Sequence, residues 1–166
     1  MPFSERHGEI GTRPLFRVAI ALGSNLGNRR ENLEYALSAL SLDLTDIAWS
    51  TFQETSPVGV GGEHAPYLNA AVVGLTRLSP RDLLERLLAI EEERGRMRPY
   101  PRAPRTLDLD LILYSNSVID EAGLSVPHPR FREREFVLGP LWEIAPDMVD
   151  PVTGKSVAEL RAALKN

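Results

Sequence analysis

Two aspartates stand two residues apart in the stretch PRTLDLDLILY, residues 104–114. Its alternation of polar and apolar residues predicts a β-strand, in which side chains two positions apart share a face. We therefore expect Asp108 and Asp110 side by side, where like charges repel unless solvent or a cation compensates them. Magnesium is typically held by one or two carboxylates together with substrate phosphates. An exposed strand face with two solvated aspartates is the alternative interpretation.

A cluster of five arginines precedes this pair, within twelve residues that contain no acidic residue. The guanidinium group binds phosphate oxygens in pairs, and in a chain of net charge -4 such a cluster indicates a small phosphorylated ligand rather than nucleic acid. A solvated basic loop is the alternative for the cluster taken alone. Metal carboxylates and phosphate-binding arginines together are typical of phosphoryl transfer. The five residues are Arg94, Arg96, Arg98, Arg102 and Arg105.

Two further segments carry polar or aromatic residues. The stretch GSNLGN, residues 23–28, lacks the Lys-Ser/Thr ending of a P-loop and the spacing of a dinucleotide motif, so it predicts a tight turn that either contacts a ligand or is purely structural. His128 stands between two prolines, and arginines follow it at alternate positions. Tyr67, Asn69 and Phe136 could hold a flat heteroaromatic ring by stacking and hydrogen bonding, although core packing is the default for any single aromatic residue.

The elements that must position these residues follow the order strand, helix, strand, strand, helix, strand. This order predicts an α+β fold, a ferredoxin-like βαββαβ sandwich with C-terminal additions. The leucines at 107, 109, 111 and 113 are expected on the strand face opposite the aspartates. The expected strands are 16–22, 47–55, 67–77 and 106–114, and the expected helices are 29–41 and 80–94. The expected additions are a short helix near 129–134, a strand-like piece at EFVLGPL (135–141) and a final helix at 156–164.

Composition sets the broad class. The 166 residues are 43% hydrophobic and 25% charged, which predicts one globular domain over residues 15–166 after a flexible extension at 1–14. The absence of cysteine excludes disulfides and thiolate metal sites. No apolar run suggests a signal peptide or a membrane span, so we expect a cytoplasmic protein. Nothing in the sequence demands more than a monomer.

Taken together, the motifs resemble those of the 6-hydroxymethyl-7,8-dihydropterin pyrophosphokinases of the folate pathway. The resemblance spans roughly residues 17–150, and it implies transfer of the β,γ-diphosphate of ATP to the hydroxymethyl group of the pterin, with release of AMP. The motifs that carry it are ALGSNLGN, TSPVG, YLNAAV, IEEERGRMR, PRTLDLDLILY and VPHPRFREREFVLGPLWEIAPD, in this order.

The resemblance also implies a role for each matching residue. Asp108 and Asp110 would hold two Mg²⁺ ions that bridge the phosphates of ATP, the co-substrate. The residues implied to contact ATP are Arg96, Arg98, Arg102, Arg105, Leu111, Ser125, His128 and Arg134. The residues implied to contact the pterin are Gly23, Thr55, Val58, Tyr67, Asn69 and Phe136. Catalysis would depend on Arg96, Arg105, Asp108 and Asp110, with Glu91 and Asn25 in supporting roles.

The chain departs from the family pattern at two positions. The arginine-rich segment has Ala103 and no tryptophan, which some members carry there, and Pro129 follows His128 where others have an aromatic residue. Two other functions stay open. A nucleotidyltransferase would release pyrophosphate, but it normally needs a third carboxylate for which we find no candidate. A non-catalytic RNA-binding module is disfavoured by the acidic net charge and the paired aspartates.

Overall fold

The structure, a computed structural model, describes residues 13–55, 66–95 and 106–165. Its main sheet has the strand order β2-β4-β1-β5 with antiparallel neighbours, and the short β3 pairs with one end of β4. This is the ferredoxin-like order, so the predicted α+β class is confirmed. The elements of this unit are β1 (Phe16–Ser24), α2 (Arg29–Leu40), β2 (Thr45–Trp49), β3 (Gln53–Thr55), β4 (Tyr67–Thr76), α3 (Pro80–Glu93) and β5 (Asp108–Tyr114).

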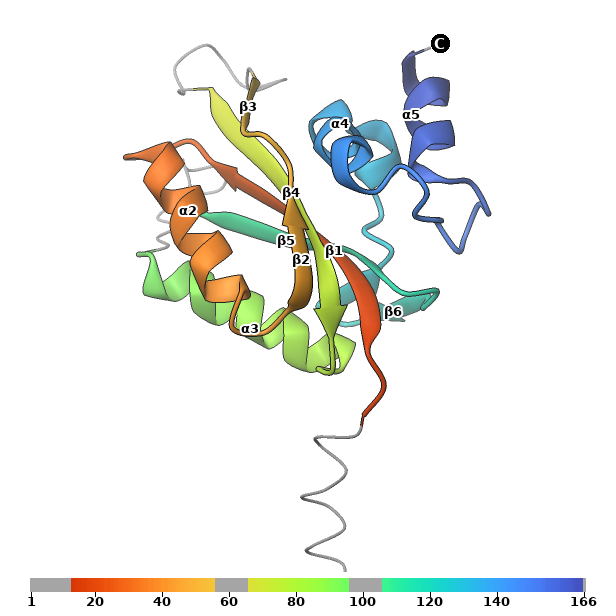
Figure 1. Cartoon of the computed structure of the whole chain (residues 1–166), viewed down its shortest axis with the longest axis horizontal. Coiled ribbons are helices and arrows are strands. Elements are labelled where there is room, and N and C mark those ends of the chain that lie inside the picture. The colour runs from red at the N-terminus through yellow and green to blue at the C-terminus, as the bar shows by residue number, and fades with distance from the viewer. Residues whose placement is uncertain (1–12, 56–65, 96–105, 166) are drawn as a thin grey trace, which may run out of the picture.

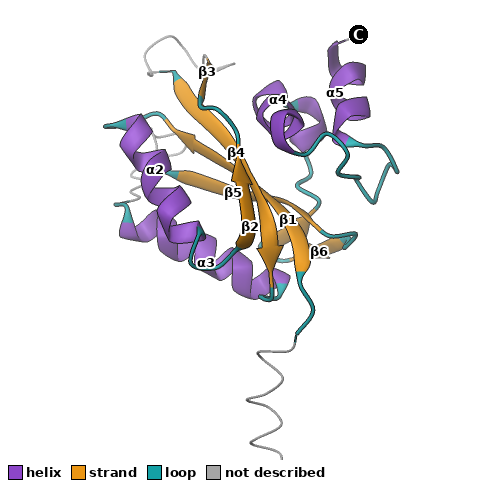
Figure 2. Cartoon of the chain, in the orientation of Figure 1, coloured by secondary structure: helices purple, strands orange, loops and turns teal. Residues whose placement is uncertain are grey.

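Helices cover both faces of this sheet, so the described part of the chain forms three layers (Figures 1 and 2). On one face, Ile20, Leu33 and Leu87 belong to a core shared by the sheet, α2 and α3. On the other face, Ala19 and Leu138 belong to a second core, which packs α4 (Glu135–Ile144) and α5 (Val157–Lys165) against the sheet. The strands therefore bury side chains on both of their faces, which explains the long apolar runs in the sequence.

Side chains cap the N-termini of the two helices of the first layer. Asn28 accepts a hydrogen bond from the backbone N–H of Glu31 at 3.1 Å, and Ser79 accepts one from Asp82 at 3.1 Å, with Pro80 as the first helical residue. Gly95 has a φ of +86°, the left-handed conformation that glycine adopts at low cost after a helix. The second helix begins at the predicted residue and ends at Glu93, one residue before the predicted end.

The C-terminal additions differ from the prediction in two ways. Ile119–Glu121 (β6) and Leu124–Val126 (β7) form a hairpin that the sequence reading placed in a loop. The segment EFVLGPL begins the helix α4, so the expected strand is wrong. Gly139 and Pro140 are the poorest helix formers, but packing of the buried Val137, Leu138 and Leu141 against the sheet outweighs their propensity. The predicted short helix is the 3₁₀ turn η1 (Phe131–Glu133), and the predicted final helix is α5.

Two of the predicted strands are also corrected. The expected strand 47–55 is divided into β2 and β3. In β5, Ala19 of β1 pairs with Leu113 and Ile20 pairs with Leu111, so Ile112 is an extra residue that forms a bulge. The bulge moves Leu113 into the second core, away from the first core that holds the leucines at 107, 109 and 111. The prediction that all four leucines share a face is therefore wrong for Leu113.

Several predictions lie outside the described residues. These are most of the N-terminal extension, nearly all of a loop predicted at 56–66, and the arginine-rich loop predicted at 96–105. Within the residues that are described, no helix has both the length and the apolar character needed to cross a membrane.

Candidate active site

The candidate site is built on the α4 face of the sheet, where four strands bring their residues into one row. Asn69 of β4 pairs with Gln53 of β3 on one side and with Gly23 of β1 on the other. Gly23 in turn pairs with Asp108 of β5. Residues paired across an antiparallel ladder point to the same face, so the polar side chains of this row face one common space.

The two aspartates share this face, as the sequence predicts. Asp110 pairs with Ala21, two residues before Gly23 on β1, and both aspartates are half-buried. The backbone N–H of Leu109, between them, donates a 2.6 Å hydrogen bond to Oε2 of the buried Glu91 on α3. Glu91 thus fixes the first residues of β5 from the α3 side of the sheet. The side chain of Leu109 is buried on that side, and both carboxylates lie on the opposite face.

The chemistry of this pair suits a hard divalent cation. Carboxylate oxygens are ligands that Mg²⁺ prefers, and half-buried carboxylates remain accessible to a ligand that brings phosphate oxygens. In the parts of the chain that the structure describes, no group of three or more histidine or acidic side chains could hold a metal ion. A magnesium site here would therefore combine two carboxylates with oxygens from substrate and water.

The side chain of Asn69 lies next to Gly23, where the absence of a side chain leaves space. Its side chain is 4% exposed, and its Nδ2 donates a 2.6 Å hydrogen bond to Oγ1 of Thr55. A Cβ atom on Gly23 would lie 3.3 Å from Oδ1 of Asn69 and 3.5 Å from Cδ1 of Tyr67. The absence of a side chain at residue 23 therefore lets the amide and the ring of Tyr67 approach β1 closely, and four residues predicted to contact the pterin are brought together.

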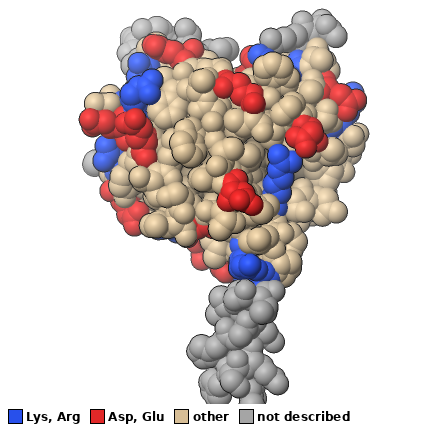
Figure 3. Space-filling view, viewed as in Figure 1, with Lys and Arg blue, Asp and Glu red and all other residues tan. Residues whose placement is uncertain are grey.

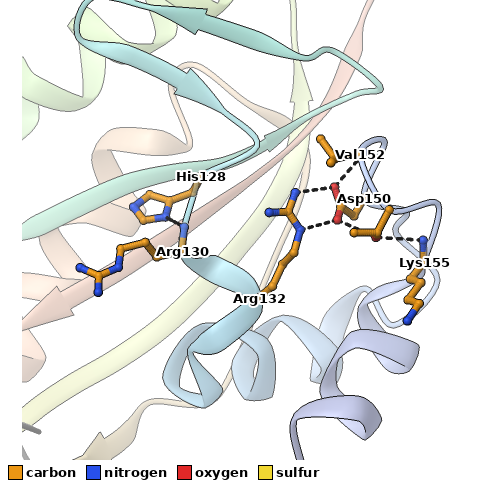
Figure 4. Close-up of polar contacts among 7 residues, drawn as sticks. His128, Arg130, Arg132, Asp150, Val152 and Lys155 are labelled. Atoms are coloured by element: carbon orange, nitrogen blue, oxygen red, sulfur yellow. Dashed lines mark hydrogen bonds and ion pairs between the residues drawn. The ribbon is translucent and has the colours of Figure 1, made fainter.

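His128 lies beyond the bulge of β5. Its backbone N–H donates a 2.9 Å hydrogen bond to the carbonyl of Ile112, and its Nδ1 accepts one from the backbone N–H of Arg130 at 3.1 Å (Figure 4). Burial lowers the pKa of His128 and the charge of Arg134 lowers it further, against an opposing effect of Asp108. The imidazole is therefore neutral at pH 7, with its proton on Nε2, where it can donate to an anionic ligand.

Arg134 and Phe136 stand together at the start of α4. The guanidinium carbon of Arg134 lies 5.4 Å from the centre of the Phe136 ring, a cation–π contact. Phe136 is 38% exposed, so part of its ring is available to a ligand. A positive charge and a flat apolar surface thus occur side by side at the N-terminus of a helix, whose dipole also favours anions.

Arg132 serves a different purpose from its neighbours. Figure 4 shows that it points away from His128 and Arg130 towards Asp150, which it binds through two nitrogen atoms at 2.6 and 3.0 Å. Burial opposes ionisation of Asp150, but hydrogen bonds from Arg132, Thr153 and the backbone of Val152 lower its pKa to about 2. The sequence reading missed this pair, although an aspartate that opens the turn DPVTG is a recognisable signal.

Asn32 is a second residue that the sequence reading missed. It is buried on α2, and its Nδ2 donates hydrogen bonds to Oγ of Ser24 at 3.1 Å and to the carbonyl of Leu26 at 2.9 Å. Its Oδ1 accepts a 2.9 Å hydrogen bond from Nε of Arg94, at the end of α3. Asn32 thus links the GSNLGN turn, which contains the buried Asn25, to the point where the arginine-rich segment begins.

The remaining predicted residues fall into two groups. Ser125 is exposed on β7, whereas Leu111 is buried in the first core and its side chain faces away from the aspartates, so only its backbone could border a nucleotide. The other group lies outside the described residues and comprises Val58, Arg96, Arg98, Arg102 and Arg105.

Comparison with protein families and curated relatives gives one consistent result. A family model described as 7,8-dihydro-6-hydroxymethylpterin-pyrophosphokinase matches residues 19–146. Two relatives share the name 2-amino-4-hydroxy-6-hydroxymethyldihydropteridine pyrophosphokinase. The one from Synechocystis sp. is 41% identical over 147 residues, which cover 86% of this chain and 73% of the relative. The one from Haemophilus influenzae is 45% identical over 134 residues, which cover 80% and 83%.

Solved structures agree on the fold. The wild-type HPPK-DHPS protein of Plasmodium falciparum matches with a TM-score of 0.74 at 15% identity, over 93% of this chain and 46% of that chain. At this identity the match shows the fold alone, and this chain spans less than half of that larger protein.

Proposed function

The chain belongs to the 7,8-dihydro-6-hydroxymethylpterin-pyrophosphokinase family, and we propose that it transfers the β,γ-diphosphate of ATP to the hydroxymethyl group of the pterin and releases AMP. This activity belongs to folate synthesis. The observation that supports the proposal most directly is the row of paired strand residues that brings Asp108 next to Gly23 and Asn69. A metal-binding carboxylate and a ring-binding amide thereby face the same space.

Asp108 and Asp110 would hold two Mg²⁺ ions. Bound there, the ions would supply charge neutralisation for the phosphates and a lower pKa for the attacking hydroxyl group. Glu91 keeps both carboxylates in place through its hydrogen bond to the backbone of Leu109. This arrangement explains why a strand that is otherwise apolar keeps two acidic residues on one face.

The pterin lies between two rings. Tyr67 and Phe136 provide the flat surfaces on either side, since both belong to the α4 side of the sheet and the Phe136 ring is partly exposed. Asn69, held by Thr55, and the backbone near Val58 form the hydrogen-bonding edge. Gly23 leaves the room that the bound ring needs.

The triphosphate of ATP is bound by cationic and neutral donors from the C-terminal half of the chain. His128 donates through Nε2, and Arg134 contributes charge from the N-terminus of α4, where the helix dipole adds to it. Ser125 and the backbone of Leu111 border the nucleotide. The arginines that close over the phosphates and stabilise developing charge are Arg96, Arg98, Arg102 and Arg105.

The enzyme acts as a cytoplasmic monomer with a single catalytic domain at residues 15–166. A surface for nucleic acid is not part of this proposal. On the face shown in Figure 3, acidic and basic side chains of the described residues are interspersed around a largely uncharged surface, without a broad basic patch. Such a patch is what electrostatic binding of a nucleic-acid backbone would require.

Product analysis tests this function. The protein is incubated with Mg²⁺, ATP and 6-hydroxymethyl-7,8-dihydropterin, and the nucleotides are separated by chromatography. Diphosphate transfer yields AMP and the pterin diphosphate in equal amounts. Formation of ADP would contradict the proposal, release of pyrophosphate would favour a nucleotidyltransferase, and absence of turnover would favour a non-catalytic binding module.

A further inference from the structure

Glu143, near the end of α4, binds the connection between β2 and β3. Its Oε1 accepts a 3.1 Å hydrogen bond from the backbone N–H of Thr51. The hydroxyl of Thr51 lies 3.0 and 2.8 Å from the two carboxylate oxygens, and Nε2 of Gln53 donates to Oε2. One exposed carboxylate therefore joins a helix to a strand about 90 residues earlier in the chain.

The same side of α4 carries Phe136. Glu143 lies seven positions after Phe136, which is close to two full helical turns, so both side chains point in nearly the same direction. Gly139 lies between them on this side, and a Cβ atom there would be 3.7 Å from Oε1 of Gln53. This side of α4 thus lies directly against β3.

A continuous set of contacts leads from Glu143 to the amide of Asn69. Gln53 and Thr55 lie two residues apart on β3, and they therefore share the face that points towards α4. Thr55 accepts the hydrogen bond from Asn69. Because β3 has only three residues and, among the described strands, pairs only with β4, its own backbone bonds fix its position weakly. The hydrogen bonds to Glu143 add a further restraint on β3.

We propose that Glu143 is a positioning residue, which fixes the distance between Phe136 and the Thr55–Asn69 pair and so sets the width of the pterin pocket. This inference rests on the proposed assignment of that pocket. Glu143 itself lies beyond the pocket and acts through Thr51 and Gln53, so its effect falls on affinity for the pterin rather than on the chemistry of diphosphate transfer.

The charge state of Glu143 agrees with this role. Burial raises the pKa of the carboxyl group, but hydrogen bonds from the backbone and hydroxyl of Thr51 and from Gln53 outweigh it and lower the pKa. Glu143 is therefore ionised at neutral pH, and charge-assisted hydrogen bonds are about twice as strong as neutral ones.

The test compares KM and kcat in the Glu143→Gln variant, which keeps the shape of the side chain and removes its charge. We expect KM for 6-hydroxymethyl-7,8-dihydropterin to rise about tenfold, whereas KM for ATP and kcat change less than about twofold. A merely structural role would instead reduce the folded fraction, which lowers the apparent kcat and leaves both KM values unchanged. An unchanged KM for the pterin would overturn the inference.

Three further variants sharpen the result. Thr51→Val removes one partner of the carboxylate and should raise the pterin KM about threefold. Adding Gln53→Glu to Glu143→Gln restores a carboxylate–amide pair and should recover most of the lost affinity. Glu121→Gln is the matched control, because this carboxylate binds Arg81 on the exterior of β6 and should leave both KM values unaltered.

Outcomes for this inference and for the proposed function are distinguishable. A wild-type protein that forms no AMP would overturn the proposed function, and the inference with it. A wild-type protein that forms AMP, together with a Glu143→Gln variant of normal pterin KM or a double variant without recovery, would overturn the inference alone.

Discussion

Along β1, side chains that face α2 and α3 are large, whereas those that face α4 are small. In the stretch VAIALG, residues 18–23, the valine, isoleucine and leucine belong to the first core, and the two alanines and the glycine point to the site side. Removing side-chain volume from one face of a buried strand leaves room there for a helix and a ligand. The other face keeps the close packing that the fold needs.

The edge strand β5 repeats this division with charge instead of size. Its leucines at 109 and 111 lie in the first core, and Asp108 and Asp110 lie on the opposite face. In β1 and β5 the large apolar side chains therefore lie on the α2/α3 face, and Gly23, Asp108 and Asp110 lie on the α4 face. Substitutions in these strands on the α2/α3 face should consequently lower stability, and substitutions on the α4 face should lower activity.

The largest effect is expected at the aspartates. Asp108→Ala and Asp110→Ala should each lower kcat/KM by about a thousandfold, because under the proposed function each removes a ligand for the cation that neutralises phosphate charge. The melting temperature should change little, since both side chains are half-buried on the ligand side. AMP formation and circular dichroism measure the two quantities, and Glu85→Ala, which changes an exposed carboxylate on α3, is the control. Retained activity in both variants would contradict the assignment of catalytic residues to the α4 face.

At Leu22, next to Gly23, we expect the opposite result, a loss of stability with little change in activity. Leu22 is 2% exposed in the first core, so Leu22→Ala should lower the free energy of unfolding by about 2–4 kcal/mol. The kcat/KM of the molecules that remain folded should stay near that of the wild type. Urea denaturation and active-site titration measure both. A selective rise in the pterin KM would show that the two faces are not independent.

The Asp150–Arg132 pair is expected to contribute to stability and not to ligand binding. Because the folded pKa of Asp150 is about 2, below its ordinary value of 3.8, the pair stabilises the folded state by roughly 2 kcal/mol above pH 4. This contribution disappears as the pH falls from about 4 to 2. Stability should therefore decrease more steeply on acidification in the wild type than in Asp150→Asn, as measured by urea denaturation at each pH. Parallel pH curves would contradict the assignment.

The smallest effect is expected at Gly23. In Gly23→Ala the new Cβ atom would crowd Oδ1 of Asn69 at 3.3 Å, so the pterin KM should rise about fivefold, equivalent to about 1 kcal/mol. The ATP KM serves as the internal control, and the melting temperature should change by only a few degrees. A loss of stability without a change in the pterin KM would place Gly23 among the structural glycines.

Sequence reasoning succeeds where a local rule determines the structure. Ser79 as N-cap, the glycine at 95 and the strict alternation of LDLD each favour the element in which they occur. The shared face of the aspartates follows from the same alternation. These rules depend only on nearest neighbours in the chain, and no distant contact overrides them.

The sequence predictions fail where contacts between residues distant in the chain determine the structure. EFVLGPL becomes a helix because the second core accepts its apolar side, and propensity alone would oppose this. The roles of Arg132 and Glu143 depend on partners 18 and about 90 residues away, which no local pattern reveals. The bulge at Ile112 is likewise visible only when β5 is paired with β1.

The bulge at Ile112 separates two functions of β5, the spacing of Asp108 and Asp110 and the attachment of the segment that carries His128. Without Ile112, the remaining residues of β5 would keep their present faces, because the strand would simply regain its regular alternation. The carbonyl of Ile112 is the group that binds the backbone of His128. The inserted residue Ile112 thus provides the point of attachment for the histidine segment, close to Asp108 and Asp110. An engineer could therefore lengthen, shorten or replace that segment while the spacing of the carboxylates stays constant.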